Sequence, residues 1–220
     1  MSLFGTLRGL PRRISDSVQR EGFARFALRA LLSPCYREVG LRAQQYSQAD
    51  CPTGPRREDV MVAPCDDISE ITRSFSDLDH QDVRERITSG ERCFVAKVDG
   101  EPAGLGWVSV TAAHIDPLRL SLPLRGRELF SHGLYVRASQ RNAGAGRAIV
   151  DAVDMWAWED GLRTHLSFVI LGRRPFGKNV RYHVATIRTL RLGPFRKFWV
   201  STYGPQAGYW RERLNELRWK

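Results

Sequence analysis

The sequence predicts an α/β fold in which helices connect the strands of one central sheet. The pair Asp99-Gly100 separates two runs rich in β-branched and aromatic residues, which is a strong signal for a β-hairpin. Strand-like and helix-like segments then alternate through the second half of the chain, as they do in α/β sheets with crossover connections. With 42% hydrophobic and 26% charged residues, the 220-residue chain can bury a sizeable core.

The first half of the predicted domain contains one strand, two helices and the hairpin. Residues 58–64 form the expected first strand. Asp66 or Asp67 caps the first helix, because a short acidic side chain before an apolar periodic run is a helix-start signal. The apolar positions that predict the two helices are Ile68, Ile71, Phe75 and Leu78 in the first, and Val83 and Ile87 in the second, which ends at Gly90. The hairpin strands are expected at 93–98 and 103–110.

The second half begins with a proline-interrupted segment, residues 113–127, which we expect to be irregular. Hydrophobic periodicity then predicts three strands and two helices, followed by a short helix in the tail. In order, these are a strand at 128–136, a helix at 144–160, a strand at 165–171, a helix at 181–192, a strand at 195–202 and a tail helix within 210–220.

Residues 1–45 are predicted to be a separate basic arm. Eight arginines and three acidic residues give the arm a net charge of +5, half of the +10 of the whole chain. Its apolar residues recur at roughly helical spacing, which predicts a basic amphipathic helix that packs on its own domain or lies on an anionic membrane surface. These residues are Ile14, Val18, Phe26, Leu28 and Leu31. Residues 46–57 hold two prolines and a glycine and are expected to be a linker, which leaves residues 58–220 as the domain.

The net charge of +10 indicates an anionic partner, either a phosphate-rich cofactor, a nucleic acid or an acidic membrane. The four cysteines lack metal-ligand spacing and have no nearby histidines, so we expect no metal site and free thiols. Arginines interrupt the N-terminus, and no apolar stretch approaches the ~20 residues of a membrane span. These features predict a cytoplasmic protein without a transmembrane segment, with peripheral membrane association through the arm as an alternative.

The loop between the strand at 128–136 and the next helix is the most informative segment. Backbone N–H groups at a helix start form an anion site, and Gly144 and Gly146 let phosphate oxygens approach closely. Arg141 and Arg147 add positive charge. Three interpretations compete: glycines that serve only helix packing, a dinucleotide site, and a pyrophosphate site for coenzyme A. The dinucleotide site fits poorly, because its third glycine would fall at Ile149.

Arg141-Asn142-Ala143-Gly144-Ala145-Gly146 resembles the signature of the GCN5-related N-acetyltransferase (GNAT) family: Arg or Gln, two residues, Gly, one residue, then Gly or Ala. The resemblance covers about residues 58–202 and excludes the arm. It implies a mixed, mostly antiparallel central sheet flanked by helices, with two parallel strands splayed at the cofactor site.

The resemblance also implies a cofactor, acetyl-CoA or another acyl-CoA, and the residues that hold it. Backbone groups of Leu134, Tyr135 and Val136 would pair with the pantetheine arm much as an added strand would. The N–H groups that would bind the pyrophosphate belong to Arg141, Asn142, Ala143, Gly144, Ala145, Gly146 and Arg147. The long basic stretch at 171–181 is either a solvated loop or a site for the 3′-phosphate or an acidic acceptor.

The implied activity is that of an N-acyltransferase, in the first place an N-acetyltransferase, in which a primary amine of a small molecule or peptide attacks the thioester directly. The family often places a carboxylate base on the strand before the motif. Glu128 and His132 share one face of that strand, and histidine in general has an unperturbed pKa of roughly 6.5, near working pH.

The tyrosine that often serves as general acid in the family has no counterpart in the expected helix at 181–192, because Thr189 stands at its place. Tyr182, which falls at the place of a family asparagine, is the first substitute, and His183 and Tyr203 are the others. The alternative function is a basic surface-binding or nucleic-acid-binding module with little catalysis, although nucleic acid is not the expected partner.

Overall fold

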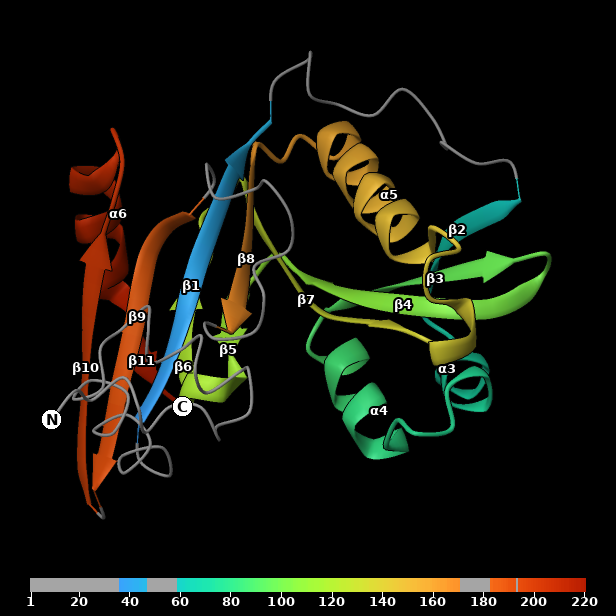
Figure 1. Ribbon diagram of the computed structural model, residues 1–220, viewed down its shortest axis with the longest axis horizontal. Helices are drawn as coiled ribbons and strands as arrows, with labels where there is room; N and C mark the ends of the chain where they lie inside the picture. The colour runs from blue at the N-terminus through green and yellow to red at the C-terminus, as the bar shows by residue number, and fades with distance from the viewer. Residues whose placement is uncertain (1–35, 47–58, 171–182, 193) are drawn as a thin grey trace, which may run out of the picture.

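The computed structural model describes residues 36–46, 59–170, 183–192 and 194–220. They form a mixed α/β fold around one large sheet, in the order β10-β9-β1-β8-β7-β4-β3-β2 (Figure 1). All neighbouring strands are antiparallel except β7 and β8, which are parallel. The strands are β1 (Tyr36–Gln45), β2 (Val60–Cys65), β3 (Arg92–Val98), β4 (Glu101–Ser109), β7 (Glu128–Val136), β8 (Thr164–Ile170), β9 (His183–Leu192) and β10 (Phe195–Thr202). The predicted fold class is therefore confirmed.

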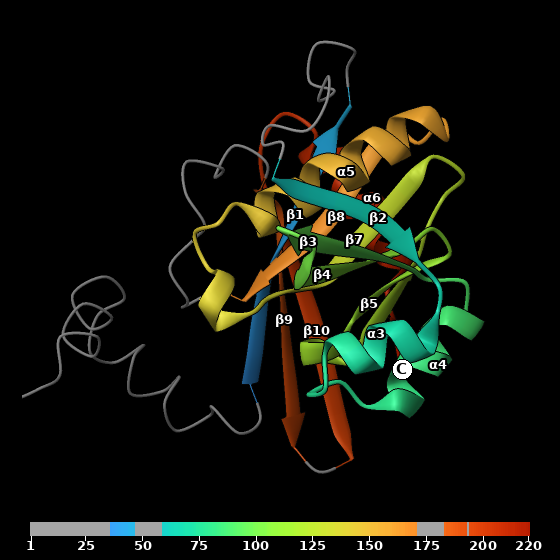
Figure 2. The same ribbon diagram turned by 90° about the vertical axis from the view of Figure 1, so that its right-hand side faces the viewer.

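Helices cover both faces of the half of the sheet that contains β2, β3 and β4 (Figure 2). On one face lies α5 (Ala145–Glu159), and on the other lie α3 (Ile68–Ser74) and α4 (His80–Thr88). Successive side chains of β3 serve the two layers in turn, because side chains alternate along a strand. Phe94 belongs to the core under α5, whereas Cys93 and Val95 belong to the core under α3 and α4.

Local signals in the first half of the chain gave the right elements. Asp67 caps α3 by accepting hydrogen bonds from the N–H groups of Ser69 and Glu70, and Asp79 caps α4 in the same way. The hairpin β3–β4 turns at Asp99 and Gly100, whose φ angles are +52° and +83°. Positive φ at both central residues is the geometry for which this residue pair is favoured.

Residues 113–127, predicted to be irregular, instead contribute two strands to a second, smaller sheet. Its order is β11-β6-β5, and its strands are β5 (Ala112–Ile115), β6 (Leu120–Pro123) and β11 (Arg218–Trp219). Alternate residues of β5 and β6 are buried against β1, β8, β9 and helix α6 (Ala207–Arg213). The prolines that suggested irregular structure fit because Pro117 lies between the two strands and Pro123 ends β6.

The predicted helix at 181–192 is wrong, because residues 183–192 form strand β9. This strand pairs with β1 on one side and β10 on the other. Ala185, Ile187 and Thr189 share one face of the strand and are all buried, and Thr186 on the other face is buried as well. Val184, Ile187 and Leu190 happen to recur at helical spacing, but the segment is rich in β-branched residues, and pairing on both sides favours the strand.

Ten residues assigned to the N-terminal arm belong to the sheet, since β1 lies between β8 and β9. Val39 and Leu41 of β1 are completely buried. The sheet therefore includes residues 36–45, which our division of the chain had placed in the arm. The apolar positions of the expected amphipathic helix, most of the linker and the basic stretch at 171–181 lie outside the described residues. No helix among the described residues is long and apolar enough to cross a membrane.

Candidate active site

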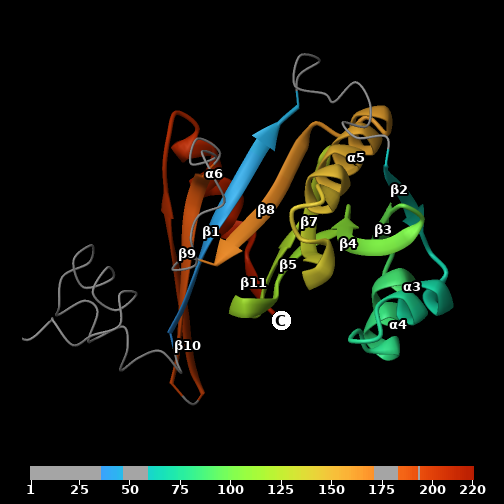
Figure 3. The same ribbon diagram turned by 45° about the vertical axis from the view of Figure 1, so that its right-hand side comes forward.

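The two parallel strands separate soon after they begin (Figures 1 and 3). Their register covers only three pairs, from Glu128↔Thr164 to Phe130↔Leu166. Beyond Phe130, β7 continues beside β4, and no described strand pairs with its other side. A polar extended ligand can therefore lie against β7 as an added strand would.

We call the region beyond Phe130, where β7 and β8 have separated, the fork. A β-bulge interrupts β7 in this region. Trp107 pairs with His132 and Leu105 pairs with Tyr135, so Gly133 and Leu134 lie opposite the single residue Gly106. Gly133 has φ +60°, and a Cβ there would meet Trp107 Cδ1 at 3.1 Å, so glycine suits the position for two reasons. The bulge turns the Leu134 side chain toward Gly106 and leaves it 50% exposed. Bulges re-aim side chains beside active sites in this manner.

The motif loop leads from the end of β7 to the first turn of α5. Within this described segment, no hydrogen bond is made by the N–H groups of Asn142, Gly144, Ala145 and Gly146, whereas Ala143 and Arg147 bond to nearby carbonyls. Unpaired N–H groups at a helix N-terminus attract anions. Arg141 and Arg147 are exposed beside them, and Arg147 also pairs with Asp151 at 2.7 Å.

The two glycines of the motif have different roles. Gly144 is the N-cap of α5 and has φ +88°, a left-handed conformation that strains other residues. Gly146 faces β7, because a Cβ there would lie 3.3 Å from Val136 Cγ2. Gly146 thus allows the helix start to pack against the end of the strand, in addition to the access for phosphate that the sequence predicted.

His132, a predicted base, is buried immediately before the bulge. Its Nε2 lies 3.2 Å from Glu91 Oε2, and its Nδ1 lies 3.2 Å from Arg86 Nη1. A guanidinium can only donate, so Nδ1 accepts and the neutral ring carries its proton on Nε2, facing Glu91. Although burial raises the pKa of Glu91, its close contacts with His132 and Arg86 stabilise the carboxylate and together hold that pKa below its usual value.

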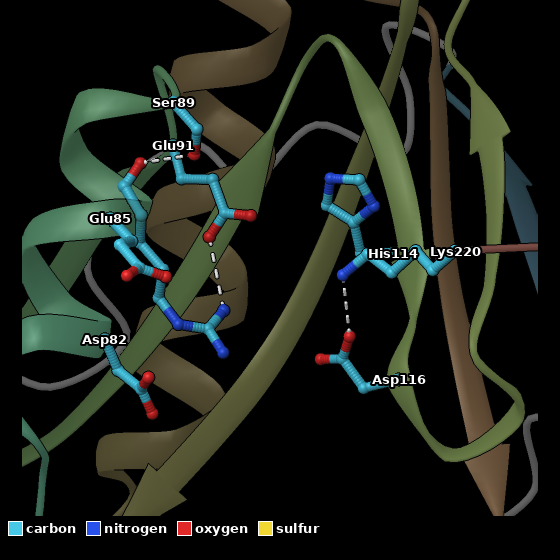
Figure 4. Close-up of a pocket in the computed structure, with 8 residues that line it drawn as sticks. Asp82, Glu85, Ser89, Glu91, His114, Asp116 and Lys220 are labelled. Atoms are coloured by element: carbon cyan, nitrogen blue, oxygen red, sulfur yellow. Dashed lines mark hydrogen bonds and ion pairs between the residues drawn. The ribbon is translucent and has the colours of Figure 1, made fainter.

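Glu91, the carboxylate next to His132, also lines a polar pocket of about 400 Å³ (Figure 4). One side comes from α4 and the residues after it, and the facing side comes from β5 and its surroundings. Figure 4 shows the two sets of side chains across the opening. The lining residues are Asp82, Glu85, Arg86, Ser89, Glu91, His114, Asp116 and Lys220.

The pocket lining is acidic. It contains four carboxylates and two cations, so its net charge is −2 with His114 neutral, in a chain whose net charge is +10. Burial and the nearby Lys220 lower the pKa of His114, which favours that neutral form.

Glu128, the other predicted base, lies at the start of β7 and is bound to the completely buried Arg213. Arg213 Nη2 lies 2.6 Å from Glu128 Oε2, and the backbone N–H of Arg125 donates to the same oxygen. Tyr182 lies outside the described residues, and the helical alignment that selected it fails because β9 is a strand. The other two substitutes contact each other: His183 begins β9, Tyr203 directly follows β10, and their ring centroids lie 5.3 Å apart.

Sequence reasoning missed Glu91 and Arg86, which complete the surroundings of His132. It also missed Ser131, His165 and Asp154, which form a hydrogen-bonded chain at the fork. Neither group had a usable signal, because its members come from elements far apart in the sequence. Tyr135, whose backbone the resemblance assigned to the cofactor, donates its hydroxyl to Asp77 at 2.9 Å and so ties β7 to the segment before α4.

Residues 61–173 match the acetyltransferase (GNAT) family, and the chain belongs to that family. The match runs from β2 through β8 and therefore includes the fork, the bulge and the motif loop. No curated protein matches the chain.

Several solved structures resemble the chain at low identity. A GCN5-related N-acetyltransferase from Sphaerobacter thermophilus is 14% identical, with 71% of this chain and 51% of that chain covered and a TM-score of 0.47. One from Kribbella flavida is 11% identical, with 86% and 66% covered and a TM-score of 0.46. A ribosomal-protein-alanine N-acetyltransferase from Brucella melitensis biovar Abortus 2308 is 17% identical, with 47% and 74% covered and a TM-score of 0.36. The chain thus spans about half to two thirds of the first two proteins.

Proposed function

We propose that this chain is an acyl-CoA-dependent N-acyltransferase, in the first place an N-acetyltransferase, that moves an acyl group to a primary amine by direct attack. The observation that carries the proposal is the continuity of three features: the fork between β7 and β8, the bulge at Gly133, and the unpaired N–H groups at the start of α5. Together they suit an elongated ligand with a polar extended arm and an anionic end.

The residues present fit an acyl-CoA donor. The pantetheine arm would lie in the fork against the backbone of Leu134, Tyr135 and Val136, where no strand among the described residues pairs with the β8 side of β7. The pyrophosphate would lie at the loop from Arg141 to Arg147, where four unpaired N–H groups and two exposed arginines supply donors and charge. When bound, the donor supplies the activated acyl thioester.

The acceptor side of the reaction would lie in the acidic pocket on the α4 face. An excess of carboxylates in a strongly basic protein favours a cationic molecule, and Glu91 links the pocket lining to His132. We therefore propose an acceptor that carries several positive charges, such as a polyamine, an aminoglycoside or a basic peptide end.

His132 is the proposed base, with Glu91 as the residue that supports it. In the structure, Arg86 donates to His132 Nδ1. A substrate amine is also an N–H donor, so it can take the place of Arg86 at this nitrogen and pass its proton to the ring. Glu91, next to Nε2, would stabilise the imidazolium that forms. Glu128 is left out of this role, because its carboxylate is engaged by Arg213.

The experiment combines acetyl-CoA with a set of amines and follows both release of free thiol and the mass of the product. The proposal predicts acetylated polycationic amines and slow or no reaction with uncharged amines of similar size. Asp82→Asn combined with Glu85→Gln should raise KM for the amine and leave KM for acetyl-CoA unchanged. Equal KM values for charged and uncharged amines would contradict the acceptor assignment.

The alternative of a basic surface-binding module depends on residues 1–35, which lie outside the described residues. Binding of the arm to anionic membranes therefore stays a prediction from the sequence.

A further inference from the structure

A hydrogen-bonded chain of three side chains reaches the fork from the α5 side of the sheet. Ser131 Oγ lies 2.5 Å from His165 Nε2, and His165 Nδ1 lies 2.9 Å from Asp154 Oδ1. Tyr46 donates its hydroxyl to the same Asp154 oxygen at 2.5 Å. The four residues come from β7, β8, α5 and the residue after β1, so four separate segments hold the group in place.

The hydrogen bonds fix the direction of this chain. An ionised carboxylate only accepts, so the His165 ring carries its proton on Nδ1, toward Asp154. Nε2 of the neutral ring then accepts from the Ser131 hydroxyl. A serine that donates to a histidine, itself oriented by an aspartate, is the arrangement that activates a hydroxyl as a nucleophile.

Ser131 lies beside the proposed site of the acyl donor. Ser131 is the first residue after the last β7–β8 pair and lies two residues before the bulge glycine. Its side chain is partly exposed, whereas His165 and Asp154 are 8% and 5% exposed. Ser131 is therefore the most exposed of the three side chains, and it lies at the position where β7 separates from β8, where the proposed function puts the acyl donor.

The cost of burial is consistent with a role beyond packing. Asp154 lies on the buried side of α5, among apolar residues such as Ile149, Val153 and Ala157. A buried carboxylate and imidazole lose solvation that an apolar pair of similar volume would not lose, and apolar replacements of buried polar pairs are often neutral or stabilising.

We propose that Ser131 is a nucleophile that takes the acyl group when no amine is bound, so that the chain also hydrolyses acyl-CoA. This inference rests on acyl-CoA binding in the fork, as argued above. Ser131 Oγ bonds to the thioester carbonyl carbon while its proton passes to His165 Nε2. The C–S bond breaks, and the sulfur takes that proton from Nε2, which leaves free CoA thiol and an ester on Ser131.

Water completes the cycle. His165 Nε2 removes a proton from a water molecule as its oxygen bonds to the ester carbonyl. The bond between that carbon and Ser131 Oγ breaks, and the serine oxygen regains a proton from Nε2. The net reaction consumes one acyl-CoA and one water and yields one carboxylic acid and one CoA thiol.

The test uses the full chain with acetyl-CoA and no amine. Acid quenching within the first turnover, followed by peptide mass spectrometry, should find one acetyl group on the peptide that contains Ser131. Thiol release should continue at a slow steady rate. Ser131→Ala should lose both the adduct and the steady release, and His165→Gln should slow release by about 100-fold or more. Ser121→Ala, on β6 in the second sheet, is the matched control and should behave as wild type.

Calorimetry with acetyl-CoA on the same proteins separates the two proposals. If wild type does not bind acetyl-CoA, the proposed function fails and this inference fails with it. If wild type binds acetyl-CoA but Ser131 carries no acetyl group after CoA release, the nucleophile assignment is overturned. It is also overturned if Ser131→Ala, folded by circular dichroism and binding acetyl-CoA normally, releases thiol as fast as wild type.

Discussion

Glu91 Oε2 lies 3.2 Å from His132 Nε2, and both side chains are buried. The carboxylate also pairs with Arg86 at 3.2 Å. This contact joins the residue immediately before β3 to the strand that precedes the motif loop. It gives the predicted base a carboxylate partner that sequence patterns did not identify.

The Glu91 ion pairs predict a pH-dependent contribution to stability. The pKa of Glu91 is lowered on folding, so its stabilisation is present above the ordinary value of 4.5 and is lost as pH falls through the lower folded pKa. At neutral pH, Glu91→Gln should lower the free energy of unfolding by about 1–3 kcal/mol. Urea denaturation at several pH values should show the difference from wild type shrinking below pH ~4.5. A difference that stays constant with pH would refute the ion-pair account.

His132 should affect the chemical step and not donor binding. Because proton transfer by a positioned side chain contributes about 10²–10⁴-fold, His132→Ala should lower kcat by that factor. The loss should be greatest near neutral pH, where the amine is still protonated and a neutral ring can accept that proton. Steady-state kinetics across pH would measure this, with the acetyl-CoA Kd expected to match wild type. An unchanged pH–rate profile would remove His132 as the base.

Glu128 should be structural, because it neutralises a completely buried guanidinium. Glu128→Ala leaves Arg213 without its closest carboxylate partner, and removing one member of a buried ion pair costs about 3–5 kcal/mol. Arg125→Ala, which breaks an exposed pair with Glu216, should cost no more than about 1 kcal/mol. Urea denaturation measures the free energy of unfolding of both variants. Similarly small losses in both would contradict the structural role of the Glu128–Arg213 pair.

Two glycines with nearly the same φ angle allow the effect of backbone strain to be distinguished from the effect of ligand binding. Gly144 has φ +88° at the start of α5, and Gly161 has φ +79° just after its end. Alanine at either position should cost about 1–2 kcal/mol of stability, because the left-handed conformation is strained for residues with a Cβ. Only Gly144→Ala should also weaken acetyl-CoA binding, because only Gly144 lies in the motif loop. If calorimetry gave equal acetyl-CoA affinities for both variants, the motif loop would not be the binding site.

Local chemistry explains which elements could be predicted. The caps at Asp67 and Asp79, the turn at Asp99-Gly100 and the apolar face of α5 are each determined by a few neighbouring residues. The motif loop was found for the same reason, since its glycines and arginines are contiguous.

Long-range pairing explains what was missed. Strand β9 depends on β1, which comes from the other end of the chain, and its helical spacing of apolar residues misled the prediction. The partners of His132 and the chain from Ser131 to Asp154 are assembled only when helices and strands pack together. A pattern read along one segment could not bring these residues into contact.

Calorimetric titration of the wild-type chain with acetyl-CoA tests the central claim most directly. The account predicts saturable binding of one molecule per chain, competition by free CoA, and weaker affinity at high salt because the loop holds phosphates by charge. Arg141→Gln should weaken the affinity with the fold unchanged by circular dichroism. The absence of any binding up to about 1 mM acetyl-CoA, the upper end of usual KM values, would contradict the account.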